Sequence, residues 1–391
     1  MLKKLLILTG DASGDAHASR VIRKLKADHP QIEIHAVGGV EIQATGVEII
    51  ENHDKLGAIA MQAFTSIHSH IKLGQKIMNH IEHWQPDAVL LVDYGGFHLR
   101  MAQQIRKRFK SIKLFYYIPP QLWASREGRI KFFKNTIDHV FCIFPFEVPF
   151  YQKHGIPVTF VGHPILETLR PIADTPELRR DLSINLEKPV IAILPGSRKS
   201  EVSQLLEPLL SALPLIAEKL PVPHQFVLVQ AKSIDDSVMN KLMDRHEHYI
   251  ANLDFHWVRG GRHHDVLAIS QAALAASGTV TLEAALYLTP SVITYKVAAI
   301  LLALKPLLLK TKYFGLPNIL LNKLLLPELL NREVNAQRIC EAFMQIYDNR
   351  VSIDLELSGL RAALEGGHED SNLTSFGASS AVSQLLISLC A

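Results

Sequence analysis

The sequence predicts an α/β protein with two doubly wound, Rossmann-like domains that face a central cleft. The chain has 391 residues, which is more than one ordinary domain holds. Short, continuously apolar runs alternate with helix-like stretches, as is typical of parallel strands that helices cover on both faces. This alternation pauses in the polar segment 174–188 and then restarts, so the runs fall into two blocks.

The apolar runs define the expected strands of each block. In the first block they are Lys4–Leu8, Glu33–Val37, Ala88–Val92, Leu114–Tyr117, His139–Ile143 and Thr159–Val161. In the second block they are Ile191–Leu194, Phe226–Val229, Phe255–Val258, Ala272–Ala275 and Val292–Thr294. We therefore expect one domain over 1–168, a second over 169–350, and a helical tail over 351–391 that can pack back on the first domain. Because ligands of such sheets bind at the carboxyl ends of the strands, the turns after the strands are expected to form the site.

Composition argues against several classes of protein. The formal net charge is only +3, and dense Lys/Arg runs are absent, so a nucleic-acid partner is not expected. Three scattered cysteines contain no Cys-x-x-Cys pair and do not predict a disulfide scaffold, which makes the reducing cytoplasm the expected compartment. The longest apolar run, 297–304, is shorter than the ~20 residues of a membrane-spanning helix. The apolar run at the N-terminus is too short for a signal peptide.

Two turns in the second block carry the strongest signal. Leu194–Glu201 and Ser277–Glu283 each follow an apolar run and open a helix-like stretch. Small residues at a helix N-terminus direct backbone N–H groups at one point, where a phosphate can bind, and Arg198 adds a guanidinium that suits phosphate oxygens. The candidate nucleotide-diphosphate residues are Gly196, Ser197, Arg198, Glu201, Ser277, Gly278, Thr279 and Glu283. The alternative is that both turns are ordinary helix N-caps.

Turns in the first block contain acids instead. The turn Thr9–Asp15 lacks the Gly-x-Gly-x-x-Gly dinucleotide fingerprint and could hydrogen-bond sugar hydroxyls, or Asp15 could cap the next helix. Asp93 directly follows a buried strand and is well placed as a general base, or as a helix cap. Aromatic and Arg residues in 116–129 suit a sugar ring or a phosphate, but also ordinary packing.

An ordered set of motifs resembles one known family. The motifs are Gly10-x-x-Ser-Gly-Asp15, Asp93-x-x-x-Phe97, Tyr117-x-x-Pro-x-x-Trp-Ala124, Pro145-Phe-Glu-x-x-Phe-Tyr151, Val161-Gly-His-Pro164, Leu194-Pro-Gly-Ser-Arg198-x-x-Glu201, Ser277-Gly-Thr-x-x-Leu-Glu283, Tyr313-x-x-Leu-Pro-Asn318 and Pro327-Glu-Leu-Leu330. Together they cover roughly residues 5–332. The chain resembles the lipid-A-disaccharide synthases, glycosyltransferases of the GT-B type.

The resemblance implies a reaction and roles for residues. UDP-2,3-diacylglucosamine would donate its sugar, with inversion, to the 6-hydroxyl of 2,3-diacylglucosamine-1-phosphate, without metal or cofactor. Asp93 would be the general base, Arg198 would face the leaving diphosphate, Ser277–Thr279 would hold that diphosphate, and Glu283 would bind the ribose. Candidates for contact with the acceptor are Asp11, Ser13, Gly14, Asp15, Tyr117, Trp123, Arg126 and His163.

Acylated substrates lead to an expectation about membranes. Segment 296–323 interleaves apolar runs with lysines, which suits peripheral contact with the cytoplasmic face of the inner membrane. The helix expected over Leu56–Trp84 could line an acyl-chain pocket. The alternative is that both segments build the core. A homodimer is possible.

Three motifs depart from the family pattern, all in the first block. Asp11 replaces a Glu, the Trp-Ala-Trp element reads Trp123-Ala-Ser125, and the Asp-x-Pro-Asp-Phe-Asn turn reads Asp93-Tyr-Gly-Gly-Phe-His98. Two other hypotheses therefore stand beside the disaccharide synthase. One is a divergent paralogue that uses another acylated or phosphorylated sugar as acceptor. The other is a non-catalytic protein that binds UDP-sugar or lipid.

Overall fold

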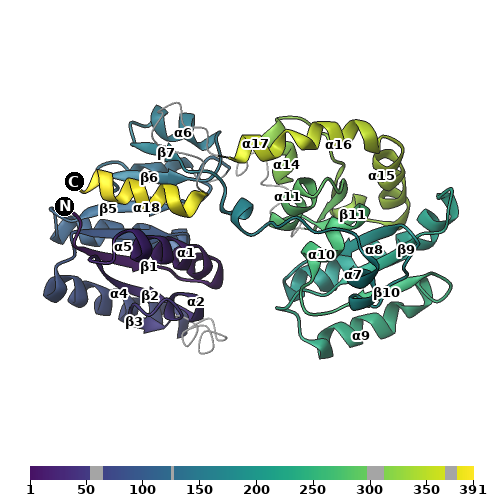
Figure 1. The fold of residues 1–391 in the computed structure, drawn as a ribbon, viewed down its shortest axis with the longest axis horizontal. Helices are drawn as coiled ribbons and strands as arrows, with labels where there is room; N and C mark the ends of the chain where they lie inside the picture. Colours follow the sequence, from purple (N-terminus) through teal and green to yellow (C-terminus); the bar gives the residue numbers. More distant parts are fainter. Residues whose placement is uncertain (53–64, 125–126, 297–311, 366–376) are drawn as a thin grey trace. The chain divides into compact units, whose positions relative to one another are not determined.

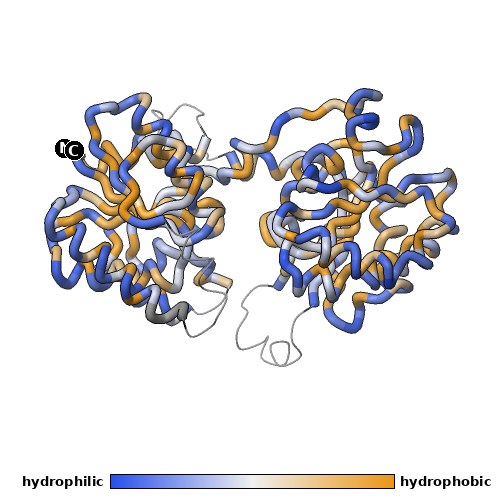
Figure 2. The backbone as a smooth tube through the Cα atoms, turned by 90° about the horizontal axis from the view of Figure 1, so that it is seen from below, coloured by the Kyte–Doolittle hydropathy of each residue, from blue (hydrophilic) through white to orange (hydrophobic). Residues whose placement is uncertain are grey.

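The computed structural model describes the chain except residues 53–64, 125–126, 297–311 and 366–376. The described residues form two compact units (Figure 1). The first consists of Met1–Glu167 and Leu364–Ala391, and the second of Thr168–Ala363. Each unit is built around its own parallel sheet, and Figure 2 shows apolar segments in the interior of both units.

The first unit contains a seven-stranded parallel sheet in the order β3-β2-β1-β4-β5-β6-β7. Its strands are β1 (Lys4–Leu8), β2 (Glu33–Gly38), β3 (Glu48–Asn52), β4 (Ala88–Val92), β5 (Lys113–Tyr117), β6 (His139–Cys142) and β7 (Val158–Phe160). β1 and β4 are neighbours at the point where the strand order reverses. Successive strands are added outward from β1 on one side (β2, β3) and outward from β4 on the other (β5, β6, β7). The carboxyl ends of β1 and β4 therefore form a topological switch point, where the fold leaves a crevice for ligands.

Helices and 3-10 turns cover this sheet. They are α1 (Ala12–Asp28), α2 (Val40–Gln43), α4 (Thr65–Trp84), α5 (Gly95–Arg108), η1 (Glu127–Phe132), α6 (Glu147–Lys153) and η2 (Pro164–Glu167). The last helix of the chain, α18 (Ala378–Leu389), packs against α1, and the Glu167 carboxylate accepts the Ser379 backbone N–H at 2.6 Å. The end of the chain thus completes the first unit (Figure 1).

The second unit contains a six-stranded parallel sheet in the order β10-β9-β8-β11-β12-β13. Its strands are β8 (Val190–Leu194), β9 (Gln225–Val229), β10 (Phe255–Val258), β11 (Ser270–Ala276), β12 (Ser291–Tyr295) and β13 (Glu328–Leu330). β8 and β11 lie side by side at the switch point of this sheet. The turns that follow them are Leu194–Arg198 and Ser277–Gly278, the two turns with the strongest signal in the sequence.

Helices cover both faces of this second sheet. They are α7 (Pro176–Asp181), α8 (Lys199–Lys219), α9 (Asp236–His246), η3 (Glu247–Tyr249), α10 (His263–Ala268), α11 (Thr279–Leu286), α14 (Leu316–Leu321), η4 (Asn331–Glu333), α15 (Ala336–Asp348), α16 (Arg350–Ser358) and α17 (Leu360–Leu364). The strands β8, β9 and β11 are buried nearly throughout, because each face of the sheet has its own apolar cluster.

These two sheets confirm the predicted class of two doubly wound, Rossmann-like domains. Two short strands were not predicted: β3, at one edge of the first sheet, and β13, at one edge of the second. None of the helices in the described part of the chain is both long enough and apolar enough to span a bilayer. Much of the segment 296–323 and the first part of the predicted helix Leu56–Trp84 lie outside the described residues.

Candidate active site

The turn after β8 is closed by Glu201, in the first turn of α8. Its Oε2 accepts the backbone N–H groups of Ser197 and Arg198, both at 3.2 Å. Gly196 has a φ of +120°, and a Cβ on it would lie 2.8 Å from the Glu201 side chain. Only glycine fits this conformation and this close approach. Two amides that the sequence assigned to a phosphate are therefore held by a carboxylate in this structure.

Arg198 is the N-cap residue of α8, and it is an exposed cation in this turn. Its side chain is 79% exposed, and its guanidinium contacts Glu201 Oε1 at 2.7 Å. An exposed i,i+3 pair of this kind contributes little to stability. The guanidinium can therefore leave Glu201 and reach an anion at small cost.

The turn after β11 leaves its helix N-terminus accessible. Ser277 N–H is held by the Thr294 carbonyl, and the first amide bonded back into the turn is that of Thr281, which donates to the Gly278 carbonyl. Within the described part of the chain, the backbone N–H groups of Gly278, Thr279 and Val280 have no hydrogen-bond partner. Three free amides at a helix N-terminus form an anion-binding position.

One pocket of about 320 Å³ joins the two turns. All eight residues that the sequence proposed for nucleotide binding line it. Val229, at the end of β9, and His263, at the start of α10, complete part of the wall. The structure thus brings these residues together around one space, whereas their role in nucleotide binding stays a prediction.

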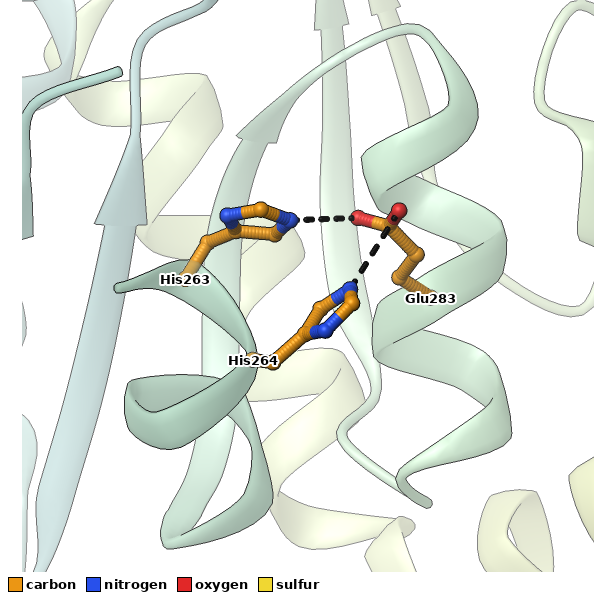
Figure 3. Close-up of side chains that lie close together, drawn as sticks. All are labelled: His263, His264 and Glu283. Carbon is orange, nitrogen blue, oxygen red and sulfur yellow. Dashed lines mark ion pairs between the residues drawn. The ribbon is translucent and has the colours of Figure 1, made fainter. Parts of the chain in front are cut away.

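Glu283 has two histidine neighbours that the sequence analysis did not single out. His263 Nε2 lies 3.2 Å from Glu283 Oε2, and His264 Nε2 lies 3.5 Å from Oε1 (Figure 3). Burial alone would raise the pKa of Glu283, but the two imidazoles outweigh it and lower that pKa to about 2. The signal that could have found them is the His-His pair that follows β10 and two glycines, at the start of the helix that precedes β11.

These three side chains are also the group of potential metal ligands that the described residues contain. Their ligand atoms all lie within 4.8 Å of one another. Two imidazoles and a carboxylate are a donor set that zinc accepts in proteins.

Asp93 lies at the switch point of the first unit, directly after β4. It has a φ of 52°, and its neighbour Tyr94 has a φ of 50°. Its Oδ1 accepts the Tyr94 N–H at 2.7 Å. Burial raises the pKa of Asp93, the negative charge of Asp11 raises it further, and the Tyr94 N–H opposes them. A carboxyl group with a raised pKa next to a glycine pair is suited to accept a proton.

The turn after β1 uses its two acids for structure. Asp11, and not Asp15, caps α1, because Asp11 Oδ1 accepts the Gly14 N–H at 2.8 Å. Asp15 is buried and accepts the backbone N–H groups of Gly39 at 2.6 Å and Glu41 at 2.8 Å, so it caps α2. Its carboxylate therefore has a structural role that the sequence did not reveal.

The other candidates of the first unit have diverse surroundings. Ser13 is exposed, and Gly14 is buried against the Val92 carbonyl. Trp123 Nε1 donates to Glu147 Oε1 at 3.0 Å, and Tyr117 is buried in the sheet. His163 is buried, and its Nδ1 accepts the Ile165 N–H at 3.1 Å. Arg126 lies outside the described residues.

A larger pocket of about 1230 Å³ lies in the first unit along α4 and α5. Apolar side chains such as Ile71, Met78 and Met101 line it beside the cations Arg100 and Lys107. Its wall includes residues 94–97, which directly follow Asp93. The pocket therefore begins next to the candidate base.

Solved structures with low sequence identity share the whole fold. A UDP-GlcNAc 2-epimerase from Neisseria meningitidis, bound to UDP-GlcNAc, aligns with a TM-score of 0.63 at 14% identity and covers 99% of both chains. The calicheamicin glycosyltransferase aligns with a TM-score of 0.60 at 13% identity, over 100% of this chain and 98% of its own. These similarities establish the two-domain architecture.

Sequence comparison identifies the family. The profile described as Lipid-A-disaccharide synthetase matches residues 5–369. A lipid-A-disaccharide synthase from Coxiella burnetii (strain CbuK_Q154) is 35% identical over 375 residues, which are 95% of this chain and 96% of the relative. A lipid-A-disaccharide synthase 1 from Legionella pneumophila (strain Lens) is 32% identical over 95% of both chains. The chain therefore belongs to the lipid-A-disaccharide synthase family, the hexosyltransferases of lipid A biosynthesis.

Proposed function

We propose that this protein is an inverting glycosyltransferase that joins two acylated glucosamines. The donor is UDP-2,3-diacylglucosamine, the acceptor is 2,3-diacylglucosamine-1-phosphate, and the products are the β-1,6-linked disaccharide phosphate and UDP. One observation carries the proposal: in a chain of this family, all eight predicted nucleotide residues line one pocket of about 320 Å³.

The donor's nucleotide occupies that pocket in our proposal. The free N–H groups of Gly278, Thr279 and Val280 bind the diphosphate at the N-terminus of α11, and Arg198 turns from Glu201 toward the same group. Glu283 lies one turn further along α11 and accepts the ribose hydroxyls. Its pKa of about 2 keeps it ionised, as an acceptor requires.

Asp93 acts as the base of the proposed reaction. It accepts the proton of the acceptor's 6-hydroxyl while that oxygen attacks the anomeric carbon of the donor. The bond from this carbon to the diphosphate breaks on the opposite face, so the configuration inverts. The electron pair leaves with UDP, where Arg198 stabilises the developing charge.

The pocket of about 1230 Å³ suits the acylated sugars. Its apolar side chains can surround an acyl chain, and Arg100 and Lys107 can balance a phosphate. Its wall includes residues next to Asp93, so a bound acceptor can extend from the base into it. Because such substrates are membrane lipids, we also propose peripheral contact with the cytoplasmic face of the inner membrane.

An assay in detergent micelles tests the proposal. The protein is incubated with both substrates without added metal, and the products are identified by mass spectrometry. We expect the disaccharide phosphate, and at least ~100-fold less product from Asp93→Ala or Arg198→Ala. The matched controls are Asp28→Ala, at the end of α1, and Arg338→Ala, which removes another exposed i,i+3 pair of the second unit. Both controls should retain the wild-type rate.

The altered turn Asp93–His98 favours one alternative, a glycosyltransferase with another acylated sugar as acceptor. In that case UDP-sugar binds, but the standard acceptor gives no disaccharide. If the protein binds UDP-sugar but transfers the sugar to no acylated acceptor, it is a binding protein, and the proposed function is wrong.

A further inference from the structure

Two histidines of α10 and one glutamate of α11 point their polar atoms at one small volume (Figure 3). His263 Nε2 and His264 Nε2 lie 3.2 and 3.5 Å from the two oxygens of Glu283. All three side chains are half-buried, and they come from adjacent helix starts at the carboxyl end of the second sheet.

The hydrogen bonds of His263 determine which of its nitrogens carries a proton. Its Nδ1 lies 3.0 Å from the carbonyl oxygen of Gly261. A carbonyl can only accept, so Nδ1 is the donor, and Nε2 is the nitrogen that faces the Glu283 carboxylate. A proton on Nε2 makes an ion pair with that carboxylate. A divalent ion that replaces this proton binds the nitrogen and the carboxylate oxygen together.

His264 supplies the sign of a missing partner. Its Nε2 is buried and has no hydrogen-bond partner, although it lies 3.5 Å from Glu283 Oε1. Buried polar atoms are nearly always satisfied, so one without a partner points to a ligand or ion. The His264 Nε2 is therefore available to bind an ion beside Glu283.

The donor atoms lie within reach of one metal ion. Ligands at about 2.0–2.2 Å from zinc are separated from each other by roughly 3.4 Å in tetrahedral geometry. The two imidazole nitrogens lie 3.2 and 3.5 Å from the two different oxygens of Glu283, and all the ligand atoms lie within 4.8 Å of one another. A metal-bound histidine typically donates its other N–H to a carbonyl or carboxylate, as His263 Nδ1 does to Gly261.

We propose that His263, His264 and Glu283 form a binding site for a zinc-class divalent ion, with one coordination position left for water. The ion is not part of the proposed transfer reaction. His263 and Glu283 also line the pocket of about 320 Å³. An ion that uses the Glu283 oxygens withdraws them from a ribose, so the ion and UDP weaken each other's binding by the same factor. The competition between the ion and UDP rests on the proposed function, whereas the metal site itself does not.

Calorimetric titration with Zn²⁺ tests the metal site in the full, untagged chain after treatment with a chelator. The chain has 19 histidines, so variants must isolate the site. We expect His264→Ala to lose one equivalent of Zn²⁺ or to bind it at least ~10-fold more weakly. His256→Ala is the matched control, because His256 also contacts a carboxylate, Asp254 at 2.7 Å, and should bind Zn²⁺ like the wild type. Identical titrations of the wild type and His264→Ala would overturn the proposal. If His264→Ala does not fold, His263→Ala carries the same test.

The coupling is measured by titrating UDP with and without Zn²⁺. Zn²⁺ also binds free UDP, so only the difference between the wild type and His264→Ala counts. We expect Zn²⁺ to raise the Kd of UDP for the wild type at least ~3-fold more than for the variant. If Zn²⁺ raises the Kd of UDP equally for the wild type and His264→Ala, or raises it more for the variant, the coupling is overturned. A protein that binds Zn²⁺ at this site but does not bind UDP would contradict the proposed function and leave the metal site intact.

Discussion

His98 Nδ1 donates a hydrogen bond to the main-chain carbonyl oxygen of Asp93 at 2.8 Å. The Tyr116 hydroxyl donates to the same oxygen, also at 2.8 Å. Two donors thus hold the backbone of Asp93, whose φ of 52° is a conformation that non-glycine residues seldom adopt. His98 is fully buried and stands where the family pattern has an asparagine.

Removal of this donor should misplace the base. We expect His98→Ala to lower kcat about 10-fold with a smaller change in KM, because the Asp93 carboxylate shifts while the pockets remain. His98→Asn should recover part of the loss, since an amide can also donate to the Asp93 carbonyl. Steady-state kinetics of both variants check this. An unchanged kcat for His98→Ala would show that the hydrogen bond does not position Asp93.

The pH dependence of activity should report the influence of Asp11 on Asp93. Burial and the Asp11 charge both raise the pKa of Asp93. A base is inactive when protonated, so activity should fall as the pH drops through this raised pKa. Asp11→Asn keeps a side-chain oxygen to cap Gly14 but removes the charge. The acidic limb of kcat/KM should therefore move to lower pH, and a limb that stays in place would rule out this interaction.

Gly10 should tolerate no larger residue. A Cβ on Gly10 would lie 2.1 Å from the ring of Tyr94. Tyr94 is also held by His70, whose Nε2 lies 2.8 Å from the Tyr94 hydroxyl. We expect Gly10→Ala to lower the free energy of unfolding by about 1–3 kcal/mol through overpacking. Gly128→Ala is the matched control, since its Cβ would meet nothing within 4 Å. Urea unfolding of both variants tests the contrast, and equal midpoints would contradict it.

Glu147 should make the first unit less stable at alkaline pH. Burial raises the pKa of Glu147 to about 7, from an ordinary value of 4.5, although three N–H donors oppose this. Between these pH values the unfolded chain releases a proton that the folded chain retains. The free energy of unfolding should therefore fall as pH rises from about 4.5 through about 7, by roughly 1 kcal/mol per pH unit.

Urea unfolding at several pH values measures this slope. Glu147→Gln should reduce the slope, because glutamine does not titrate. The variant should also be less stable at acidic pH, since its amide cannot accept the Trp123 N–H as well as both backbone N–H groups. A slope as steep as that of the wild type would mean that another group titrates in this range.

Local sequence determined the sheets and the two turns that line the pocket of about 320 Å³. Runs such as Val190–Leu194 are apolar because helices cover the strand on both faces, and such a continuous apolar run is visible in the sequence itself. Leu194–Glu201 and Ser277–Glu283 were recognisable because small residues follow an apolar run and open a helix-like stretch, a pattern shared by anion-binding turns and ordinary N-caps. The edge strands β3 and β13 left no such pattern, since one is only half-buried and the other has three residues.

The tertiary structure decided how the polar residues are used. Asp11 and Asp15 look equivalent in the sequence. In the structure Asp11 caps α1, whereas Asp15 caps α2, which begins about 25 residues further along the chain. His263 and Glu283 are 20 positions apart, and they meet only because α10 and α11 begin at the same edge of the sheet. Parallel pairing of β8 with β11 brings Leu194 beside Ala275, and this register places the two turns around one pocket. Contacts of this kind depend on strand order and register, which are set by packing between distant segments and leave no trace in a local pattern of residues.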